Sequence, residues 1–518
     1  MTRPEVTRPL RGGALLAIDQ GTTNTKALLL DVSTGAVVAE ASAPTSIAFP
    51  APGWVEQDAE RIWTATLLAI EGCLEQQPEA AVLGIGISNQ RETVVCWSRS
   101  TGRPLGPALG WQDARTARWC ADLLEREPLA AQTIRQRTGL TLDPMFSAPK
   151  FRASIDAAVA GGVDPADVAV GTVDAWLVGR LTGRHVTEVG NASRTLLLDL
   201  ASLTWHDELL TLFGIDATHL PELLPSDAPF GVTSTRLGRL PAGIPVVAVL
   251  ADSHAALYHH GCTTPGTGKA TYGTGTSVMS PTTDPSPGPH GIATTVAWHV
   301  GGRPTYAREG NIVASGSALD WMASTLGVPK GAAGGAHLTA LATEVPDSGG
   351  VCFVPAFSGL GAPYWDRAAV GVLAGVSAGT TRGHLARAAL EGVAHQVADV
   401  VEAMESDGST RIDILHADGG ATASGLLMQV QADLLGRPLE VAGSPAASAL
   451  GAARLAAEQL GVAPPPADAG RCVAPHSSSP DPGAARRAWR QAIARSRGVT
   501  VSQADSALRD ETIERNDP

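Results

Sequence analysis

The stretch LLAIDQGTTNTKALLLD, residues 15–31, constrains the fold of this chain more than any other segment. Two apolar runs flank a polar turn of Gly, Thr and Asn, a pattern typical of two buried strands joined as a hairpin. Asp19 ends the first run and Lys26 begins the second. The stretch therefore predicts a buried hairpin with one acidic and one basic side chain near its tip.

The tip of this hairpin has the chemistry of a phosphate site. Backbone N–H groups and hydroxyls at Thr22, Thr23 and Asn24 suit phosphate oxygens, and Lys26 adds a positive charge. Asp19 cannot bind phosphate directly, so its position favours a Mg²⁺ ion between the two, usually bound through water. An ordinary turn with a surface Asp is the alternative that this stretch leaves open.

Two other glycine sites have similar properties. GKATYGTGTSVMS, residues 268–280, repeats the pattern of strand, Gly-Thr-Gly turn and strand, and Gly419-Gly420 stand between a strand and a helix. Such sites present N–H groups to phosphate or let a purine approach closely. The two hairpins suggest two related halves with a hinge near residues 250–266. Three sites of this kind favour phosphate binding over ordinary turns.

Strands and helices alternate along the chain, which predicts α/β layers. Examples are the strands 83–87, 246–250 and 412–416, and the helix 384–404 with an apolar stripe at spacings of three and four. Ser424 is expected to cap the start of a helix that ends at Gly436. With 518 residues, the chain is too long for one ordinary domain.

Two nucleotide-binding motifs can be discarded. GCTTPGTGKAT resembles a Walker loop, but Thr263 occupies the place of its first Gly. No GxGxxG motif follows the first strand, so a dinucleotide site is not supported.

Asp252 is the strongest candidate for catalysis. It follows the apolar strand 246–250 and precedes a helix, and ligand sites in α/β sheets form at the carboxyl ends of strands. A helix cap is the alternative explanation. Nearby His254, His259 and His260 lack a metal-binding spacing and are expected in the core or on the surface.

The stretch ISNQRET suggests a site for a polyhydroxylated small molecule. Arg91 and Glu92 follow the strand 83–87 and present hydrogen-bond donors and acceptors side by side. Trp111 offers a flat apolar face for a carbon chain. A surface ion pair and a core Trp are the alternatives.

Charge and composition exclude several classes. The net charge of −13 makes nucleic acid an unsuitable partner. The six scattered cysteines form no CxxC motif, which indicates a reduced, cytoplasmic protein. The N-terminus has no apolar segment, so no signal peptide is expected. No apolar stretch approaches the ~18 residues of a membrane helix.

The assembled motifs resemble those of the FGGY carbohydrate kinases and, within that family, the glycerol kinases. The resemblance covers residues 14–495 and rests on AIDQGTTNTKALLLD, PGWVEQD, GISNQRETVVCW, GTVDAWL, NASRTLLLDL, TYGTG, PAFSGLGAPYWD and DGGATASGLLMQ.

The resemblance implies an α/β fold with two ribonuclease H-like domains of the actin and sugar-kinase type and a cleft between them. The expected organisation is a disordered arm at 1–12, a polyol-binding N-terminal domain at 13–258, a nucleotide-binding C-terminal domain at 259–460, and an extension at 461–518 whose tail is partly disordered. The oligomeric state stays open, a homo-oligomer included.

The resemblance also implies roles for individual residues. Asp252 is expected to be the catalytic base and, with Arg91, Glu92 and Trp111, to bind the polyol. Asp19 is expected to hold Mg²⁺. ATP is expected to contact Thr22, Thr23, Asn24, Lys26, Thr274, Gly316, Asp320, Gly420 and Ser424. Asp320 and Ser424 stand where glycerol kinases typically have Gln and Asn.

Three pocket positions depart from the glycerol kinase pattern. Met145 replaces a Tyr, Ser253 replaces a Gln, and Ser277 replaces an aromatic residue. Lost hydrogen bonds of this kind cost about 1 kcal/mol each and can change substrate preference.

The expected reaction is transfer of the γ-phosphoryl group of ATP to a terminal hydroxyl of glycerol, giving glycerol 3-phosphate and ADP. A tetritol, a pentitol or a ketose is the alternative acceptor. An actin-like ATPase or a ligand sensor without catalysis is the alternative from another class.

Overall fold

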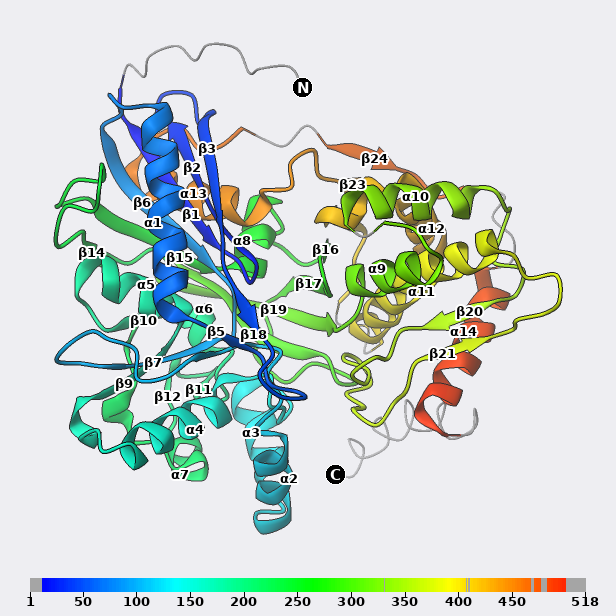
Figure 1. The fold of residues 1–518 in the computed structure, drawn as a ribbon, viewed down its shortest axis with the longest axis horizontal. Coiled ribbons are helices and arrows are strands. Elements are labelled where there is room, and N and C mark those ends of the chain that lie inside the picture. Colours follow the sequence, from blue (N-terminus) through cyan, green and yellow to red (C-terminus); the bar gives the residue numbers. More distant parts are fainter. Residues whose placement is uncertain are drawn as a thin grey trace.

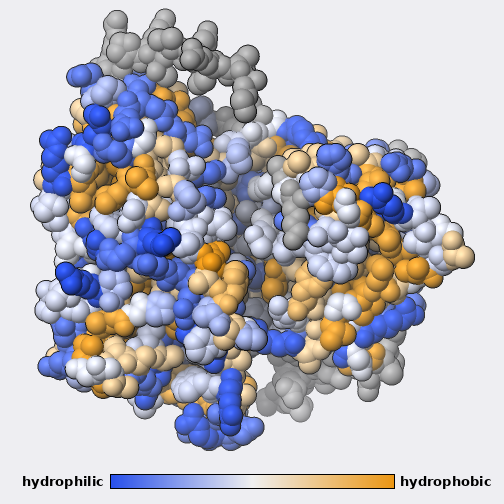
Figure 2. All heavy atoms as spheres, in the orientation of Figure 1, coloured by the Kyte–Doolittle hydropathy of each residue, from blue (hydrophilic) through white to orange (hydrophobic). Residues whose placement is uncertain are grey.

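The computed structural model describes residues 12–329, 331–406, 408, 410–466, 470–476 and 482–499. The predicted disordered arm, except for Gly12, and the predicted disordered tail lie outside these residues. Figure 1 shows two lobes, each built around a twisted sheet. The face drawn in Figure 2 is hollowed between the two lobes.

The first lobe contains a six-stranded sheet that includes the predicted hairpin. The order is β14 (Gly231–Val232), β15 (Pro245–Ala251), β6 (Val82–Asn89), β1 (Ala14–Gln20), β2 (Asn24–Asp31) and β3 (Val37–Pro44). β1 pairs antiparallel with β2 and parallel with β6, and β6 pairs parallel with β15. The prediction of a hairpin at residues 15–31 is confirmed.

The residues of β1 alternate between two cores. Leu16 and Ile18 pack in the cluster that contains Ile62 and Trp63 of α1 (Ala59–Gln76). Leu15 and Ala17 pack on the opposite face of the sheet. Because both faces are covered, the strand reads as a continuous apolar run.

The second lobe repeats this arrangement. Its seven-stranded sheet has the order β18 (Ala293–Val300), β19 (Arg303–Ile312), β17 (Thr276–Thr282), β16 (Thr267–Tyr272), β22 (Ile414–Asp418), β23 (Leu439–Val441) and β24 (Arg471–Val473). β16 pairs antiparallel with β17 and parallel with β22, which pairs parallel with β23. Each lobe thus contains a hairpin whose first strand is extended by two parallel strands.

Helices of the second lobe cover its sheet. The main ones are α9 (Gly316–Thr325), α10 (Ala332–Thr343), α11 (Arg382–Glu405) and α12 (Gly425–Leu435). A further helix of this lobe, α14 (Pro482–Arg497), packs against α11. In α11 the predicted stripe is buried at Ala389, Val393, Val397 and Val400. Ser424 caps α12 and Gly436 ends it, as predicted.

Smaller elements complete the first lobe. A second sheet has the order β4 (Ile47–Ala48), β5 (Glu56–Gln57), β8 (Ala108–Leu109), β7 (Val94–Ser98) and β9 (Val168–Thr172). The helices are α2 (Ala117–Arg126), α3 (Ala130–Thr138), α4 (Ser147–Ala160), α5 (Val173–Thr182), α6 (Val189–Ala192) and α7 (Asp207–Phe213). The short strand pairs of this lobe are β10 (Val186–Glu188) with β13 (Glu222–Leu224) and β11 (Leu198–Asp199) with β12 (Thr204–Trp205). A further pair, β20 (Cys352–Val354) with β21 (Val372–Ala374), belongs to the second lobe and packs against α14.

Two helices fill the space behind the first sheet. α8 (Asp252–His259) packs against α13 (Ala447–Leu460), and α13 packs against β6, β1 and β15. In sequence, α13 lies between β23 and β24 of the second sheet, yet it packs on the first lobe (Figure 1). A Cβ on Gly451 of α13 would lie 1.8 Å from the carbonyl oxygen of Ala255 in α8, so the two helices meet backbone to backbone.

Within the described residues, no helix combines the length and apolar character needed to cross a membrane. All six cysteines are free thiols.

Candidate active site

Asp252 lies where a parallel strand becomes a helix. β15 ends at Ala251, and Asp252 is the first residue of α8. Its side chain makes no cap bond to the helix; one carboxylate oxygen accepts a hydrogen bond from the neighbouring Ser253 N–H at 2.6 Å. The side chain is 36% exposed, and the other contact is an ion pair of 3.3 Å with Arg91. The helix-cap alternative is therefore wrong.

Asp19 is electrostatically coupled to Asp252. It stands near the end of β1 and accepts a hydrogen bond of 2.9 Å from Ser88. Burial and the charge of Asp252 raise the pKa of Asp19 to about 6, while Lys26, its partner across the hairpin, opposes the shift. Burial and Glu92 likewise raise the pKa of Asp252, against the opposing charge of Arg91. A buried carboxylate whose ionisation is disfavoured by a second carboxylate suits a position that receives a cation.

Arg91 and Glu92 are buried and do not form the surface ion pair that was the alternative. Arg91 pairs with Asp252 and, at 2.6 Å, with Glu309. Glu92 pairs with Arg194 at 2.7 Å. The backbone of Glu92 has a φ of 59°, a left-handed conformation that costs energy for a residue with a side chain.

Sequence reasoning missed two members of this network, Arg194 and Glu309. Arg194 is fully buried and lies beside the ring of Phe146, at 5.1 Å. Glu309, in the middle of β19, is also fully buried and pairs with Arg194 at 2.7 Å. The sequence carries no clear signal for Glu309, because the strand RPTYAREGNI mixes polar and apolar residues.

The first hairpin touches the predicted polyol residue Trp111. The indole N–H of Trp111 donates to Thr22 Oγ1 at 3.1 Å. Thr23 and Asn24 at the tip are exposed, and Lys26 is half-buried. The tip is therefore open to a ligand, and one of its threonines is already oriented by Trp111.

The three substituted positions lie close to these residues. Ser277 donates a hydrogen bond of 3.1 Å to Glu309. Ser253 is buried directly after Asp252. The carbonyl of Met145 accepts a hydrogen bond of 2.7 Å from Lys150, a buried lysine that also donates to Gly110, next to Trp111. Burial lowers the pKa of Lys150 to about 7.

The second lobe contains a cavity of about 670 Å³. All of the nucleotide residues predicted in this lobe line it: Thr274, Gly316, Asp320, Gly420 and Ser424. The turn of the second hairpin closes one side, because Gly273 and Thr274 accept hydrogen bonds from the first N–H groups of α9. Asp320 accepts from the Gly331 N–H at 3.2 Å, and Ser424 accepts from Thr339 at 2.9 Å.

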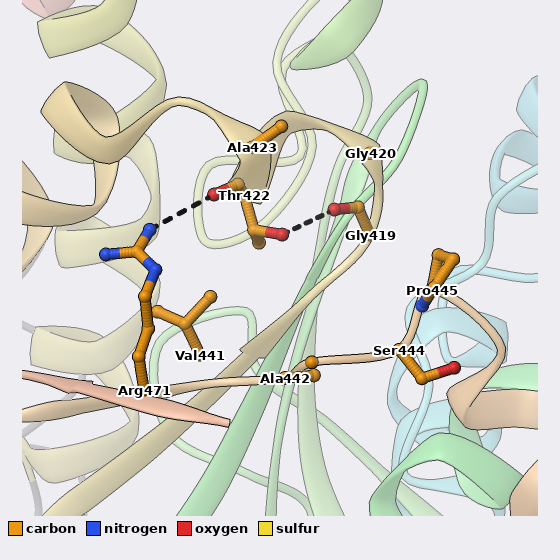
Figure 3. Close-up of a pocket in the computed structure, with 10 residues that line it drawn as sticks. Gly419, Gly420, Thr422, Ala423, Val441, Ala442, Ser444, Pro445 and Arg471 are labelled. Atoms are coloured by element: carbon orange, nitrogen blue, oxygen red, sulfur yellow. Dashed lines mark hydrogen bonds between the residues drawn. The ribbon is translucent and has the colours of Figure 1, made fainter. Parts of the chain in front are cut away.

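The loop 419–423 also lines a smaller cavity of about 320 Å³ (Figure 3). Thr422 donates to the Gly419 carbonyl at 2.7 Å and keeps the loop compact. Gly419 has a φ of 95°, and a Cβ there would lie 2.5 Å from the Tyr272 carbonyl oxygen. At Gly420 nothing lies within 4 Å of an added Cβ, so this side of the loop is open.

The histidines near Asp252 are not arranged as a metal centre. His254 is fully buried, and burial together with Arg91 holds its pKa well below the ordinary value. His260 pairs with Asp418 at 2.7 Å. No group of three or more potential metal ligands occurs among the His, Cys, Asp and Glu residues that the structure describes.

Comparison with known proteins decides the family. Residues 14–258 match the N-terminal domain, and residues 268–460 the C-terminal domain, of the FGGY family of carbohydrate kinases. The chain belongs to this family.

Individual relatives of this FGGY kinase include enzymes for two kinds of acceptor. The chain is 42% identical to the glycerol kinase of Alkalilimnicola ehrlichii over 94% of its own length and 98% of that protein. It is 45% identical to the apulose kinase of Pectobacterium atrosepticum over 86% of its length and 90% of that protein. The structure superposes on Plasmodium falciparum glycerol kinase with ADP with a TM-score of 0.83, at 28% identity, covering 93% of this chain and 98% of that one.

These findings confirm the fold and the class of enzyme. The FGGY kinase is an ATP-dependent carbohydrate or polyol kinase with two domains of the sugar-kinase type. The alternative of an actin-like ATPase or a sensor is not favoured by the family assignment.

Proposed function

We propose that this FGGY kinase transfers the γ-phosphoryl group of ATP to a terminal primary hydroxyl of glycerol, giving glycerol 3-phosphate and ADP. The relatives named glycerol kinase support this acceptor. The observation that carries the proposal is the half-exposed carboxylate of Asp252, ion-paired with Arg91 and coupled to Asp19.

The acceptor residues have complementary tasks in this proposal. Arg91 and Glu92 would donate to and accept from the hydroxyls, and Trp111 would cover the carbon chain. Met145 and Ser253 would form the remaining wall. Residues 13–258 would thus act as the polyol-binding domain, and residues 259–460 as the nucleotide-binding domain.

Asp252 would take the proton of the attacking hydroxyl. A carboxylate is a weak base for an alcohol, but phosphoryl transfer passes through a loose transition state in which that proton moves late. Positioning of the hydroxyl therefore contributes more than base strength. The ion pair with Arg91 fixes the carboxylate for this task.

The phosphates of the nucleotide would lie at the two hairpins, and its nucleoside end would lie in the large cavity. Thr22, Thr23, Asn24 and Lys26 would face its phosphates from the first lobe, and Thr274 from the second. Gly316, Asp320, Gly420 and Ser424 would contact the nucleoside end. N–H groups at both hairpins can stabilise charge on the transferring group.

The donor set at Asp19 fits a hydrated Mg²⁺ ion. Its carboxylate is a hard oxygen ligand beside a second carboxylate, and the pKa of about 6 leaves it ionised at neutral pH. Asp19 would hold the ion through water, and the ion would neutralise phosphate charge. Free thiols are consistent with a cytoplasmic location, which we also propose.

A larger ketose is a second candidate acceptor. The relative named apulose kinase is as similar as the glycerol kinases, and Ser253 and Ser277 are smaller than the residues expected in a glycerol pocket. The extra space would accommodate a longer or branched acceptor.

Purified protein with Mg-ATP should be tested against glycerol, erythritol, threitol, xylitol, dihydroxyacetone, xylulose and apulose, with ADP release as the readout. Glycerol is expected to give the highest kcat/KM. Asp252→Ala is expected to abolish transfer and to leave ATP affinity within about twofold, because Asp252 lies outside the nucleotide cavity. A ketose preferred over glycerol would overturn the proposed acceptor, and full activity of the variant would overturn the base.

A further inference from the structure

We infer that Glu309, a residue of the second lobe, positions both the base and the acceptor-binding carboxylate of the first lobe. The inference rests on the proposed function of Asp252 and Glu92. It concerns a residue that touches neither the acceptor nor the nucleotide in that proposal and acts through two arginines.

The contacts form one continuous chain. Oε1 of Glu309 lies 2.6 Å from Nη1 of Arg91, whose Nε lies 3.3 Å from Asp252. Oε2 of Glu309 lies 2.7 Å from Nη1 of Arg194, whose Nε lies 2.7 Å from Glu92. The two oxygens of the Glu309 carboxylate therefore bind Arg91 and Arg194. These two arginines in turn bind the carboxylates of Asp252 and Glu92.

Burial makes this arrangement specific. Glu309 and Arg194 are fully buried, and Arg91 is 7% exposed. Arg194 and Arg91 hold the pKa of Glu309 below its ordinary value in spite of its burial. In such surroundings, removal of one charge leaves its partners uncompensated rather than hydrated. Both arginines would then have to find other partners.

The chain also crosses between the lobes. Arg91 and Glu92 follow β6 of the first sheet, and Arg194 follows α6, whereas Glu309 belongs to β19 of the second sheet. The orientation of the acceptor site therefore depends on the second lobe being in contact.

The charges around Asp252 determine the sign of the expected pH effect. Asp19 on β1, Glu92 after β6 and Glu309 on β19 are negative. Arg91 after β6 and Lys269 on β16 are positive, and His254 on α8 is held neutral. If Glu309 loses its negative charge, it no longer offsets the positive charge of Arg91, and Arg91 lowers the pKa of Asp252 further. Asp252 then ionises at lower pH and becomes a weaker base.

Glu309→Gln tests this inference because it keeps the shape and removes the charge. We expect kcat/KM for the acceptor to fall about a hundredfold, through both a higher KM and a lower kcat. The affinity for ATP measured without acceptor should stay within about twofold. The acid limb of the pH profile of kcat/KM should move about one unit toward lower pH. Glu309→Asp, which keeps the charge but is shorter, should raise the acceptor KM and leave the acid limb in place.

Asp399→Asn is the matched control. Asp399 is also a buried carboxylate; it lies in α11 and pairs with Arg486 at 2.5 Å and with the Trp489 indole at 2.7 Å. This variant should lose thermal stability with the acceptor KM and the acid limb unchanged.

All variants are measured with the acceptor that the wild type phosphorylates best. If that acceptor is not glycerol, the wild-type rates alone overturn the proposed acceptor, and the variants still test the role of Glu309. The inference is overturned if Glu309→Gln resembles Asp399→Asn, with lower stability but an unaltered acceptor KM and acid limb. If Glu309→Gln does not fold, Glu309→Asp decides: an unchanged acceptor KM in that variant overturns the inference.

Discussion

At the scale of single residues, the proposed site contains an acid, Asp19, whose ionised form lowers the stability of the folded protein. The pKa of Asp19 is raised from 3.8 to about 6 by burial and by Asp252. A raised native pKa means that the native state binds the proton more tightly than the unfolded chain does. The contribution of the Asp19 side chain to the free energy of unfolding is therefore fully present below about pH 4 and is lost as the pH rises through about 6.

Asp19→Asn should consequently stabilise the protein at pH 8 by about 1 kcal/mol, after allowance for partial solvent screening of the shift. The gain should vanish near pH 4, and kinase activity should be lost. Thermal unfolding at both pH values without divalent ions measures the difference. Asp31→Asn is the control, because Ser33 lowers the pKa of Asp31 and the expected change has the opposite sign. Equal melting temperatures of Asp19→Asn and wild type at pH 8 would contradict the prediction.

Acceptor preference is a second property of individual side chains. Met145→Tyr combined with Ser253→Gln should improve kcat/KM for glycerol relative to xylitol and xylulose by about tenfold, through regained hydrogen bonds of about 1 kcal/mol. Met145→Leu is the control and should leave the ratio unchanged. Unaltered ratios in the double variant would show that these positions do not contact the acceptor.

The residues that sequence patterns could find are those in motifs. Asp19, Arg91, Glu92 and Asp252 each follow an apolar strand, where a polar residue is conspicuous. Glu309 could not be found in this way, because its role depends on Arg91 and Arg194, which are distant in sequence and meet it only through tertiary packing.

At the scale of secondary-structure elements, the position of Asp252 depends on the crossing of α8 and α13. Gly451 meets the backbone of Ala255 in α8, and Gly86 of β6 meets the backbone of Ala452 in α13. The proposed base is therefore held in place through α8, a helix that meets α13 without intervening side chains.

Gly451→Val should push α8 away from α13 and destabilise the protein by about 1–3 kcal/mol, the usual cost of overpacking. Transfer activity should fall even at temperatures where the variant is folded, because Asp252 moves with α8. Gly179→Ala in α5 is the control, since its new Cβ would meet only the Arg184 carbonyl oxygen at 3.6 Å. Denaturant unfolding and kcat/KM below the melting transition test both variants. A folded Gly451→Val variant with wild-type kcat/KM would argue against this coupling.

Elements were predictable where one pattern dominates. Both hairpins carry a Gly-Thr turn between two strand-forming runs, and α11 shows a stripe at helical spacing, so strands and helix agree with the structure. The composition of residues 462–485, which are rich in Pro, Ala and Ser, predicts a loop, but the short strand β24 lies within them. It is a strand because Leu439 and Val441 of β23 offer an edge to pair with.

At the scale of the whole molecule, the proposed nucleotide cavity and the proposed acceptor site belong to different lobes, and Glu309 of the second lobe contacts Arg91 and Arg194 of the first. Binding on one side should therefore affect binding on the other. Glycerol should increase the affinity for a non-hydrolysable ATP analogue by about tenfold, and the analogue should increase glycerol affinity by the same factor. Calorimetric titration in both orders measures this, with xylose isomers that are not phosphorylated as a control. Independent affinities would contradict the coupling.

The two-lobed architecture was predictable from the repeated hairpins, but the path of the chain between the lobes was not. No local pattern distinguishes α13 from a helix that stays with the second sheet. Its alanine-rich faces fit the narrow space between α8 and the strands β1, β6 and β15, and that fit exists only in three dimensions.

This return of α13 has a consequence for synthesis on the ribosome. Residues 12–258 can emerge and form strands, but the apolar face made by Leu15, Ala17, Ala248 and Leu250 stays uncovered until residues 447–460 have been translated. The nascent first lobe must therefore wait, with this face exposed to chaperones or to other nascent chains, until most of the second lobe has been made.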